Sequence, residues 1–198
     1  MGCWLLGKIH KAKETGDSPR KEREAYEALC SYLLRRRKRQ NHCRRRLAAR
    51  MAGYGKRCCS FSFLRAAKPG RSIVLRPAQF QILRSEKPFP FTFQMDEAQK
   101  QELREIHNGL LRQALEQCRR EAFGLAVLDE AFAALQENLL DEALLQKFLS
   151  ELRGRMEIVL TGRTPPKAYL DLADYVTEMT LRKHPYGQGL EARRGVEY

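Results

Sequence analysis

Short apolar runs alternate with amphipathic stretches over residues 78–198, and this alternation is the strongest constraint on the fold. The runs predicted as strands are Phe80–Leu83, Leu125–Leu128, Met156–Leu160 and Tyr175–Met179. The predicted helices run from Asp96, a good N-cap residue, to about Ala122, from about Asp141 to Arg153, and from Pro165 through Ala173. Strands that alternate with helices build βα units, so the sequence predicts an α/β fold with a parallel sheet. A chain of 198 residues has room for one domain with a hydrophobic core.

The charged residues divide the chain into two parts of different composition. Residues 1–77 hold 21 of the 37 Lys and Arg residues but only five of the 24 acidic residues, and no acid occurs between Glu27 and Glu86. Five of the six Cys residues precede residue 60, without the spacing of a metal site, so we expect a reducing, cytoplasmic location. No apolar run approaches the roughly 20 residues of a bilayer span, which excludes an integral membrane protein. The hydrophobic fraction of 43% argues against a wholly disordered chain.

Charged residues follow two of the predicted strands. Asp129 and Glu130 end the run at 125–128, and Arg163 follows the run at 156–160. In P-loop nucleotide-binding folds, an acid at the carboxyl tip of a strand holds Mg²⁺ directly or through water. Alternatively, Asp129 and Glu130 only open the next helix, whose N-terminal dipole favours acids. Arg163 can pair with phosphate oxygens, or else with an acid on the protein surface.

Five segments of the second part resemble one enzyme family. They are Val127–Glu130, Ile158–Arg163, Leu170–Met179, Lys183–Tyr186 and Arg194–Tyr198. Together they are similar to the C-terminal half of the P-loop type ATP:corrinoid adenosyltransferases, over about residues 80–198. Each segment alone is weak evidence, but five in register identify the family.

The resemblance implies a RecA-like P-loop fold and transfer of the 5′-deoxyadenosyl group of ATP to cobalt(I) of a corrinoid, with release of triphosphate. This reaction serves adenosylcobalamin biosynthesis or salvage. Mg²⁺ or Mn²⁺ would be held by the P-loop Thr and by Asp129 or Glu130, and Arg163 would contact phosphate. The resemblance also implies an electron donor that reduces cobalt(II), a homodimer for an intact chain, and no membrane partner.

An aromatic pair precedes the first long predicted helix. Phe91-Thr92-Phe93 stands where the family has Phe-Thr-Trp, so Phe93 departs from the family pattern. The resemblance implies that Phe91 and Phe93 displace the lower axial ligand of cobalt(II), which makes the four-coordinate metal easier to reduce. The alternative is an alternating strand in which Phe89, Phe91 and Phe93 bury one face.

A P-loop enzyme needs a Gly-rich loop with a Lys and a Thr, and residues 1–77 as written hold no such loop. Arg35–Arg46 stands in the expected place, whereas Leu47–Arg57 again looks like the family segment that follows the P-loop. A reading-frame error explains both observations. Read one base forward with suitable synonymous codons, Arg35–Arg46 can give Gly-Glu-Gly-Lys-Gly-Lys-Thr-Thr-Ala-Ala-Val-Gly, the family's P-loop. Read two bases forward, Cys58–Arg71 can give an apolar strand followed by Gln-Phe-Leu-Lys-Gly, which is similar to the family.

As written, the chain is therefore expected to be one nominal P-loop domain over residues 1–198, with a disrupted or disordered basic region at 1–77 and a family-like part at 78–198. We expect residues 31–46 and 58–77 not to pack as in the family, because unpaired Arg side chains cannot be buried. The sheet would then lack its central strands, and the chain would bind ATP poorly and be inactive. The alternative is a nucleic-acid-binding protein that contacts phosphates through residues 31–77, a less favoured interpretation because no nucleic-acid motif occurs there.

Overall fold

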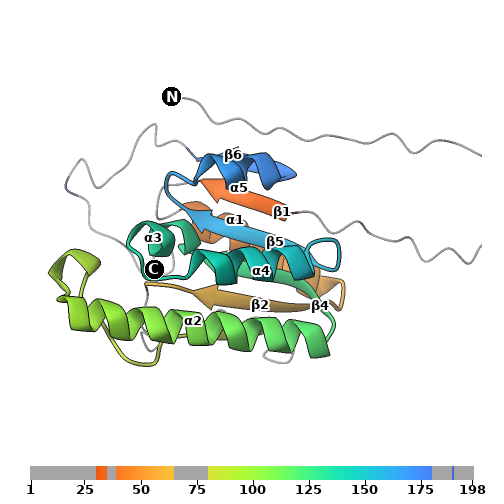
Figure 1. The fold of residues 1–198 in the computed structure, drawn as a ribbon. Helices are drawn as coiled ribbons and strands as arrows, with labels where there is room; N and C mark the ends of the chain where they lie inside the picture. The colour runs from red at the N-terminus through yellow and green to blue at the C-terminus, as the bar shows by residue number, and fades with distance from the viewer. Residues whose placement is uncertain (1–29, 35–38, 65–79, 180–188, 190–198) are drawn as a thin grey trace, which may run out of the picture.

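The computed structural model describes residues 30–34, 39–64, 80–179 and 189, and the strands among them form one six-stranded sheet (Figure 1). The strands are β1 (Cys30–Leu34), β2 (Arg57–Ser62), β3 (Phe80–Arg84), β4 (Phe123–Asp129), β5 (Glu157–Gly162) and β6 (Tyr175–Glu178). Their order across the sheet is β3-β2-β4-β5-β1-β6, and every neighbouring pair is parallel. The predicted α/β fold with a parallel sheet is confirmed, and the four strands predicted after residue 78 are β3, β4, β5 and β6.

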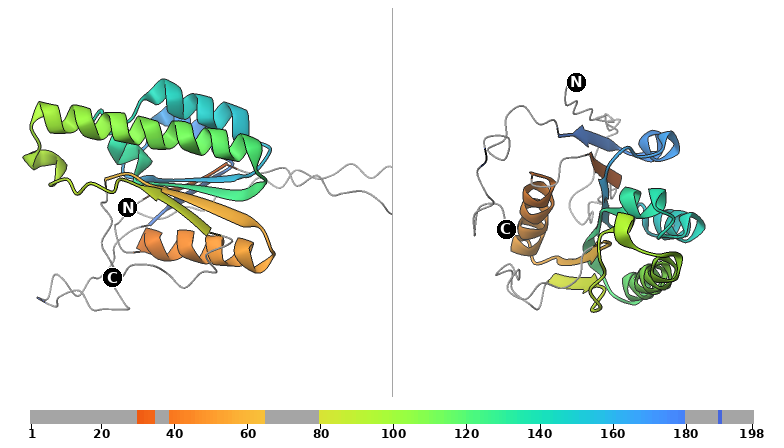
Figure 2. Two further views of the ribbon diagram at one scale, coloured as in Figure 1. Left: turned by 90° about the horizontal axis from the view of Figure 1, so that it is seen from below. Right: turned by 90° about the vertical axis from the view of Figure 1, so that its left-hand side faces the viewer.

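Helices cover both faces of this sheet (Figure 2). Among the described helices, α1 (Arg39–Gly53) lies on one face by itself. The opposite face is covered by α2 (Glu97–Arg120), α3 (Ala131–Gln136), α4 (Glu142–Leu152) and α5 (Lys167–Leu172). Both faces of a parallel sheet must be covered, because its strands are apolar on both sides.

The helices α2 and α4 begin at the residues that the sequence predicts. Asp96 accepts the N–H of Gln99 at 2.7 Å, and the Gln99 side chain accepts the N–H of Asp96 in return. Asp141 caps α4 through the N–H groups of Ala143 and Leu144. These side chains satisfy N–H groups that the first turn of a helix leaves without partners, which explains the starting points.

The side chains of β4 alternate between two hydrophobic layers. Ala126 and Leu128 belong to the larger layer, beneath α2, α3 and α4, whereas Leu125 and Val127 belong to a smaller layer beneath α1. All four side chains are at most 2% exposed. A strand that is buried on both faces reads as a continuous apolar run, as residues 125–128 do.

Two strands come from the region predicted to be disrupted, so the prediction that the sheet lacks its central strands is wrong. β2 lies between β3 and β4, and β1 lies between β5 and β6. The physical reason is that neither strand buries an Arg. β1 contains none, and Arg57 at the start of β2 is exposed and pairs with Glu121. Cys58, Cys59 and Phe61 are at most 1% exposed, and they supply the apolar side chains of a buried strand.

Several sequence predictions lie outside the described residues. They concern positions 35–38, where a P-loop would stand, and the family-like segments Lys183–Tyr186 and Arg194–Tyr198. Among the described helices, none has the length and apolar character needed to cross a bilayer.

Candidate functional site

Asp129 and Thr161 lie side by side at the carboxyl ends of β4 and β5. The Thr161 hydroxyl donates to Asp129 Oδ1 at 2.8 Å, and the same hydroxyl oxygen accepts the N–H of Glu130 at 2.9 Å. Asp129 is 1% exposed and Thr161 is fully buried. Hydrogen bonds in such surroundings are strong because water does not compete for the partners.

Glu130 follows directly and has the left-handed backbone conformation, with φ 61° and ψ 27°. It is the N-cap residue of α3, but its side chain makes no capping hydrogen bond. Glu130 thus opens the next helix, as the alternative interpretation of the acid pair has it. Asp129 does not, because it is the last residue of the buried strand β4. The unusual backbone of Glu130 turns its N–H toward the Thr161 hydroxyl.

The segment after β5 is tightly held, and it contains Arg163. Gly162 approaches Phe132 so closely that a Cβ atom at position 162 would lie 2.7 Å from Phe132 Cβ. The Gln136 side chain donates to the carbonyl oxygens of Arg163 and Thr164, at 3.2 and 2.8 Å. Thr164 is a β-branched residue with φ 40°, a conformation that needs such support. The backbone around Arg163 is thus fixed by α3.

Phe91 and Phe93 are exposed, at 62% and 81%, and their rings stack with centroids 5.5 Å apart. Phe93 lies in a short 3₁₀ turn, Thr92–Gln94, in the connection from β3 to α2, and Phe91 is the N-cap residue of this turn. The alternating-strand interpretation is wrong, because only Phe89 packs partly against the core. Since β3, β2, β4 and β5 pair in parallel, the connection from β3 to α2 leaves the sheet at the edge where β4 and β5 also end (Figure 1).

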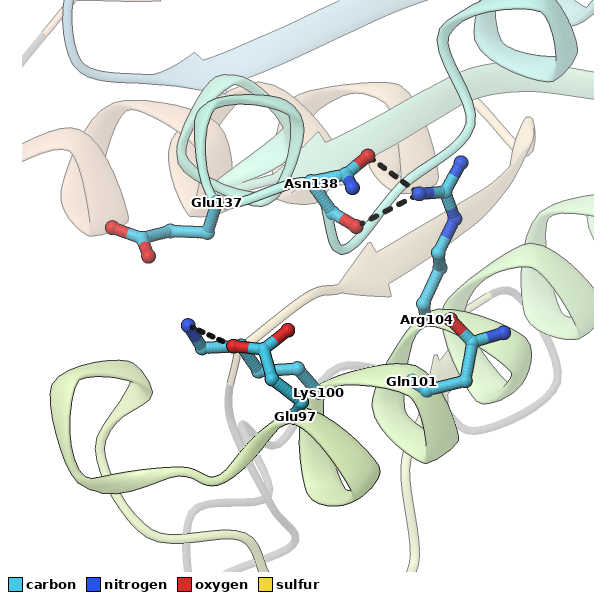
Figure 3. Close-up of a pocket in the computed structure, with 6 residues that line it drawn as sticks. All are labelled: Glu97, Lys100, Gln101, Arg104, Glu137 and Asn138. Carbon is cyan, nitrogen blue, oxygen red and sulfur yellow. Dashed lines mark hydrogen bonds and ion pairs between the residues drawn. The ribbon is translucent and has the colours of Figure 1, made fainter.

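A shallow polar hollow of about 170 Å³ lies between the start of α2 and the end of α3 (Figure 3). Its lining residues are Glu97, Lys100, Gln101, Arg104, Glu137 and Asn138. Arg104 spans the hollow and donates to the backbone and side-chain oxygens of Asn138. None of the predicted site residues lines it, so the hollow is separate from the Asp129–Thr161 pair.

His107 and Asn108 on α2 hold the segment that precedes α4, a role that no pattern in the sequence indicates. His107 Nδ1 lies 2.9 Å from the carbonyl oxygen of Leu139, and its Nε2 accepts the N–H of Leu64 at 3.5 Å. Asn108 Oδ1 accepts the N–H of Asp141 at 2.9 Å. Burial lowers the pKa of His107 to about 4, against the opposing effect of its bond to Leu139. His107 is therefore a neutral structural residue.

The described residues could supply some, but not all, of the ligands of a Mg²⁺ or Mn²⁺ ion. No group of three or more His, Cys, Asp or Glu side chains is arranged there to hold a metal ion. Mg²⁺ does not need such a cage, because it keeps several waters and binds one or two carboxylates together with substrate phosphates. A buried, oriented Asp129 carboxylate next to Glu130 supplies the hard oxygen donors that Mg²⁺ and Mn²⁺ prefer.

The sequence is also similar to that of a known protein family. A sequence profile described as "ATP:corrinoid adenosyltransferase BtuR/CobO/CobP" matches residues 46–198. The chain belongs to this family. The match begins at the last residue of the Arg35–Arg46 run, which is where the reading frame is predicted to return.

Individual relatives are named corrinoid adenosyltransferases. A corrinoid adenosyltransferase of a Sinorhizobium species is 41% identical over 86 residues, which is 43% of this chain and 40% of that protein. One from Pseudomonas aeruginosa is 38% identical over 78 residues, 38% of this chain and 37% of that protein. The chain thus spans about two fifths of the length of these two relatives. The Escherichia coli enzyme is 25% identical over 154 residues, 76% of each chain.

Proposed function

We propose that this protein transfers the 5′-deoxyadenosyl group of ATP to cobalt(I) of a corrinoid and releases triphosphate, within adenosylcobalamin biosynthesis or salvage. The observation that carries the proposal is that Asp129 and Arg163 follow the carboxyl ends of the adjacent parallel strands β4 and β5, while the exposed Phe91–Phe93 stack lies in the connection after β3. Ligands of open α/β sheets bind at this edge. Family membership supports the same reaction.

The nucleotide would lie across the ends of β1, β4 and β5, in a RecA-like P-loop arrangement. β5 separates β1 from β4, so the strand before the P-loop position and the strand with Asp129 are not neighbours. Residues 35–38 connect β1 to α1, the place of a phosphate-binding loop. Arg163, held by Gln136, pairs with phosphate oxygens.

Asp129 or Glu130 would hold Mg²⁺ or Mn²⁺ together with the phosphates. Such a cation, when bound, would supply positive charge next to the triphosphate leaving group. Asp129 Oδ1 accepts a hydrogen bond from the Thr161 hydroxyl, and Asp129 is 1% exposed, so bulk water does not replace this bond. Asp129 therefore acts as a fixed oxygen donor and does not need to move during the reaction.

Phe91 and Phe93 act on the corrinoid. Their stacked rings are exposed, so they can contact a large apolar substrate without any rearrangement of the core. In this proposal they displace the lower axial ligand of cobalt(II), and an external electron donor then reduces the four-coordinate metal. Cobalt(I) attacks ribose C5′ as the C5′–O bond to triphosphate breaks, and correct positioning supplies much of the rate. We also propose a cytoplasmic homodimer.

The proposal includes a frame error in the basic part. In the shifted reading, Gly-Glu-Gly-Lys falls at positions 35–38 and Gly-Lys-Thr-Thr at 39–42, the start of α1. A P-loop has this arrangement, with the loop before the helix and the Lys and Thr at its first turn. The start of the family match at residue 46 agrees with this position.

The test is to sequence the gene across codons 25–80 and to assay two chains, as written and frame-restored, for ATP-dependent formation of the cobalt–carbon bond from cobalt(I). We expect activity in the restored chain and at least a hundredfold less in the written one, since one lost oxyanion-type contact alone costs about 10²–10³ in rate. An inactive restored chain would overturn the proposed reaction. Codons that exclude the shifted reading would overturn the frame error, and salt-dependent binding of nucleic acid would then favour the basic-module alternative.

A further inference from the structure

We propose that Thr161 is the positioning residue that directs the Asp129 carboxylate toward the bound divalent cation. The inference rests on the proposed function, which assigns that cation to Asp129. It goes further because it gives a role to an uncharged residue, which acts on the cation through Asp129.

The direction of the hydrogen bonds at Thr161 is fixed by the partners themselves. A hydroxyl has one proton to donate. The backbone N–H of Glu130 can only donate, so at 2.9 Å it takes a lone pair of the Thr161 oxygen. The one hydroxyl proton is then left for Asp129 Oδ1, at 2.8 Å. Asp129 must therefore present Oδ1 as an acceptor, which holds its carboxylate plane in one orientation.

The surroundings prevent this hydroxyl from turning elsewhere. Thr161 is fully buried and Asp129 is 1% exposed, so bulk water does not replace either bond. A β-branched side chain in a strand has restricted rotation about its first bond. β4 and β5 are paired directly, with Leu128 opposite Leu160 one position earlier. The two residues thus meet because their strands are neighbours, and β5 acts as the rigid support of the carboxylate.

The same hydroxyl also controls the backbone after Asp129. Glu130 has φ 61°, an uncommon conformation for a residue other than Gly, Asn or Asp. Its N–H finds its partner in the Thr161 side chain. Loss of the hydroxyl removes a donor from Asp129 and an acceptor from Glu130 at once. Both oxygen-bearing residues of the proposed cation site are therefore coupled to one atom.

The test uses the full 198-residue chain and Mn²⁺ alone as the probe. Mn²⁺ is titrated into ¹⁵N-labelled protein, and paramagnetic broadening of amide signals is recorded, which detects weak binding. We compare the wild type with Thr161→Ser, which keeps the hydroxyl, and with Thr161→Val, which has the same shape without it. Thr161→Ala is measured as well, in case the valine methyl beside two polar groups disturbs folding. Asp129→Asn and its combination with Thr161→Val complete a double-mutant cycle.

We expect broadening of amides at 129–131 and 161–163 in the wild type and in Thr161→Ser. Thr161→Val and Thr161→Ala should need about tenfold more Mn²⁺, as substitutions of residues that orient metal ligands do. Asp129→Asn should abolish the local broadening by Mn²⁺. The double variant with Thr161→Val should behave like Asp129→Asn alone. Ile158→Val, a core substitution on the same strand, should leave the Mn²⁺ dependence unchanged.

Two other results would overturn the inference, and they differ. If Asp129→Asn loses the broadening while Thr161→Val and Thr161→Ala keep the wild-type dependence, Thr161 does not position Asp129 and the proposed function stands. If Asp129→Asn broadens like the wild type, or the wild type shows no local broadening, Asp129 does not hold the cation. The metal role in the proposed function then fails, and the inference fails with it.

Discussion

The imidazole ring of His107 meets the ring of Phe63 edge to face, with centroids 5.2 Å apart. Its two nitrogens are occupied by the carbonyl oxygen of Leu139 and the N–H of Leu64, an arrangement that suits the neutral ring with its proton on Nδ1. Because α2, the end of β2 and the segment before α4 all meet at this ring, its protonation affects three parts of the fold.

Acid should therefore destabilise the protein through His107. Its pKa is about 4 in the folded state and 6.5 ordinarily, so between these values the unfolded state binds more protons. Neutral His107 contributes fully to the free energy of unfolding above pH 6.5. This contribution is lost as the pH falls from 6.5 to 4, by about 3 kcal/mol in total. Urea unfolding at pH 7, 5.5 and 4 measures it. His107→Gln is the control, and the advantage of the wild type over this variant should shrink by that amount; a constant difference would contradict the prediction.

Removal of the Asn108 side chain should weaken the start of α4. Asn108 is 4% exposed and accepts the N–H of Asp141, the residue that caps α4. Asn108→Ala leaves that N–H without its acceptor, so we expect a loss of about 1–3 kcal/mol in the free energy of unfolding. Gln101→Ala on the exposed side of α2 is the matched control, with a change within about 0.5 kcal/mol. Equal changes in the free energy of unfolding for the two variants would show that the Asn108–Asp141 hydrogen bond does not stabilise the protein.

Two glycine substitutions should change stability in opposite directions. Gly162→Ala brings a Cβ to 2.7 Å from Phe132 Cβ, at φ 156°, so we expect a loss of about 1–3 kcal/mol from overpacking. Gly109→Ala lies on α2 with no atom within 4 Å of the new Cβ, and it should gain up to about 1 kcal/mol from helix propensity. Chemical denaturation of both variants checks the signs. A tolerated Gly162→Ala would mean that α3 can move away from β5.

Phe91→Ala and Phe93→Ala should separate activity from stability. Both rings are exposed, so the free energy of unfolding should change by less than about 0.5 kcal/mol. In the frame-restored enzyme, reduction-dependent adenosylation should fall at least about tenfold, as expected for loss of an aromatic contact of 1.5 kcal/mol or more. The spectroscopic signal of four-coordinate cobalt(II) should decrease in parallel. Phe89→Leu, at a half-buried position, is the control that should keep the signal; unchanged adenosylation in both Ala variants would exclude the pair from the reaction.

The sequence predicts those elements whose signals are local. Asp96 caps α2 as predicted, α4 starts directly after Asp141 as predicted, and the runs at 125–128 and 156–160 form adjacent strands of the sheet. The bounds of α3 are not predictable from the sequence pattern, because six residues carry too little periodicity. The prediction that β2 is missing is wrong, since the basic composition of the region conceals a short buried segment, Cys58–Phe61.

The candidate site could be predicted only in part, for a related reason. Asp129, Glu130 and Arg163 stand at strand ends, which a pattern of apolar runs reveals. Thr161 and Gln136 act through hydrogen bonds across segments about thirty residues apart, and these depend on which strands are neighbours. The order of strands across a sheet depends on long-range pairing and not on local sequence. No local sequence pattern therefore predicts the role of either residue.

The position of β1 has a consequence for synthesis of the chain. Both partners of β1, the strands β5 and β6, lie more than a hundred residues later in the sequence. Nascent β1 therefore leaves the ribosome long before any segment that can pair with it, whereas β2 and β3 follow each other closely. Long-range parallel pairing is slow and leaves strand edges exposed during folding. The earliest of the described strands is thus among the last to be hydrogen-bonded, and a chain cut short before residue 157 would carry β1 without either of its neighbours.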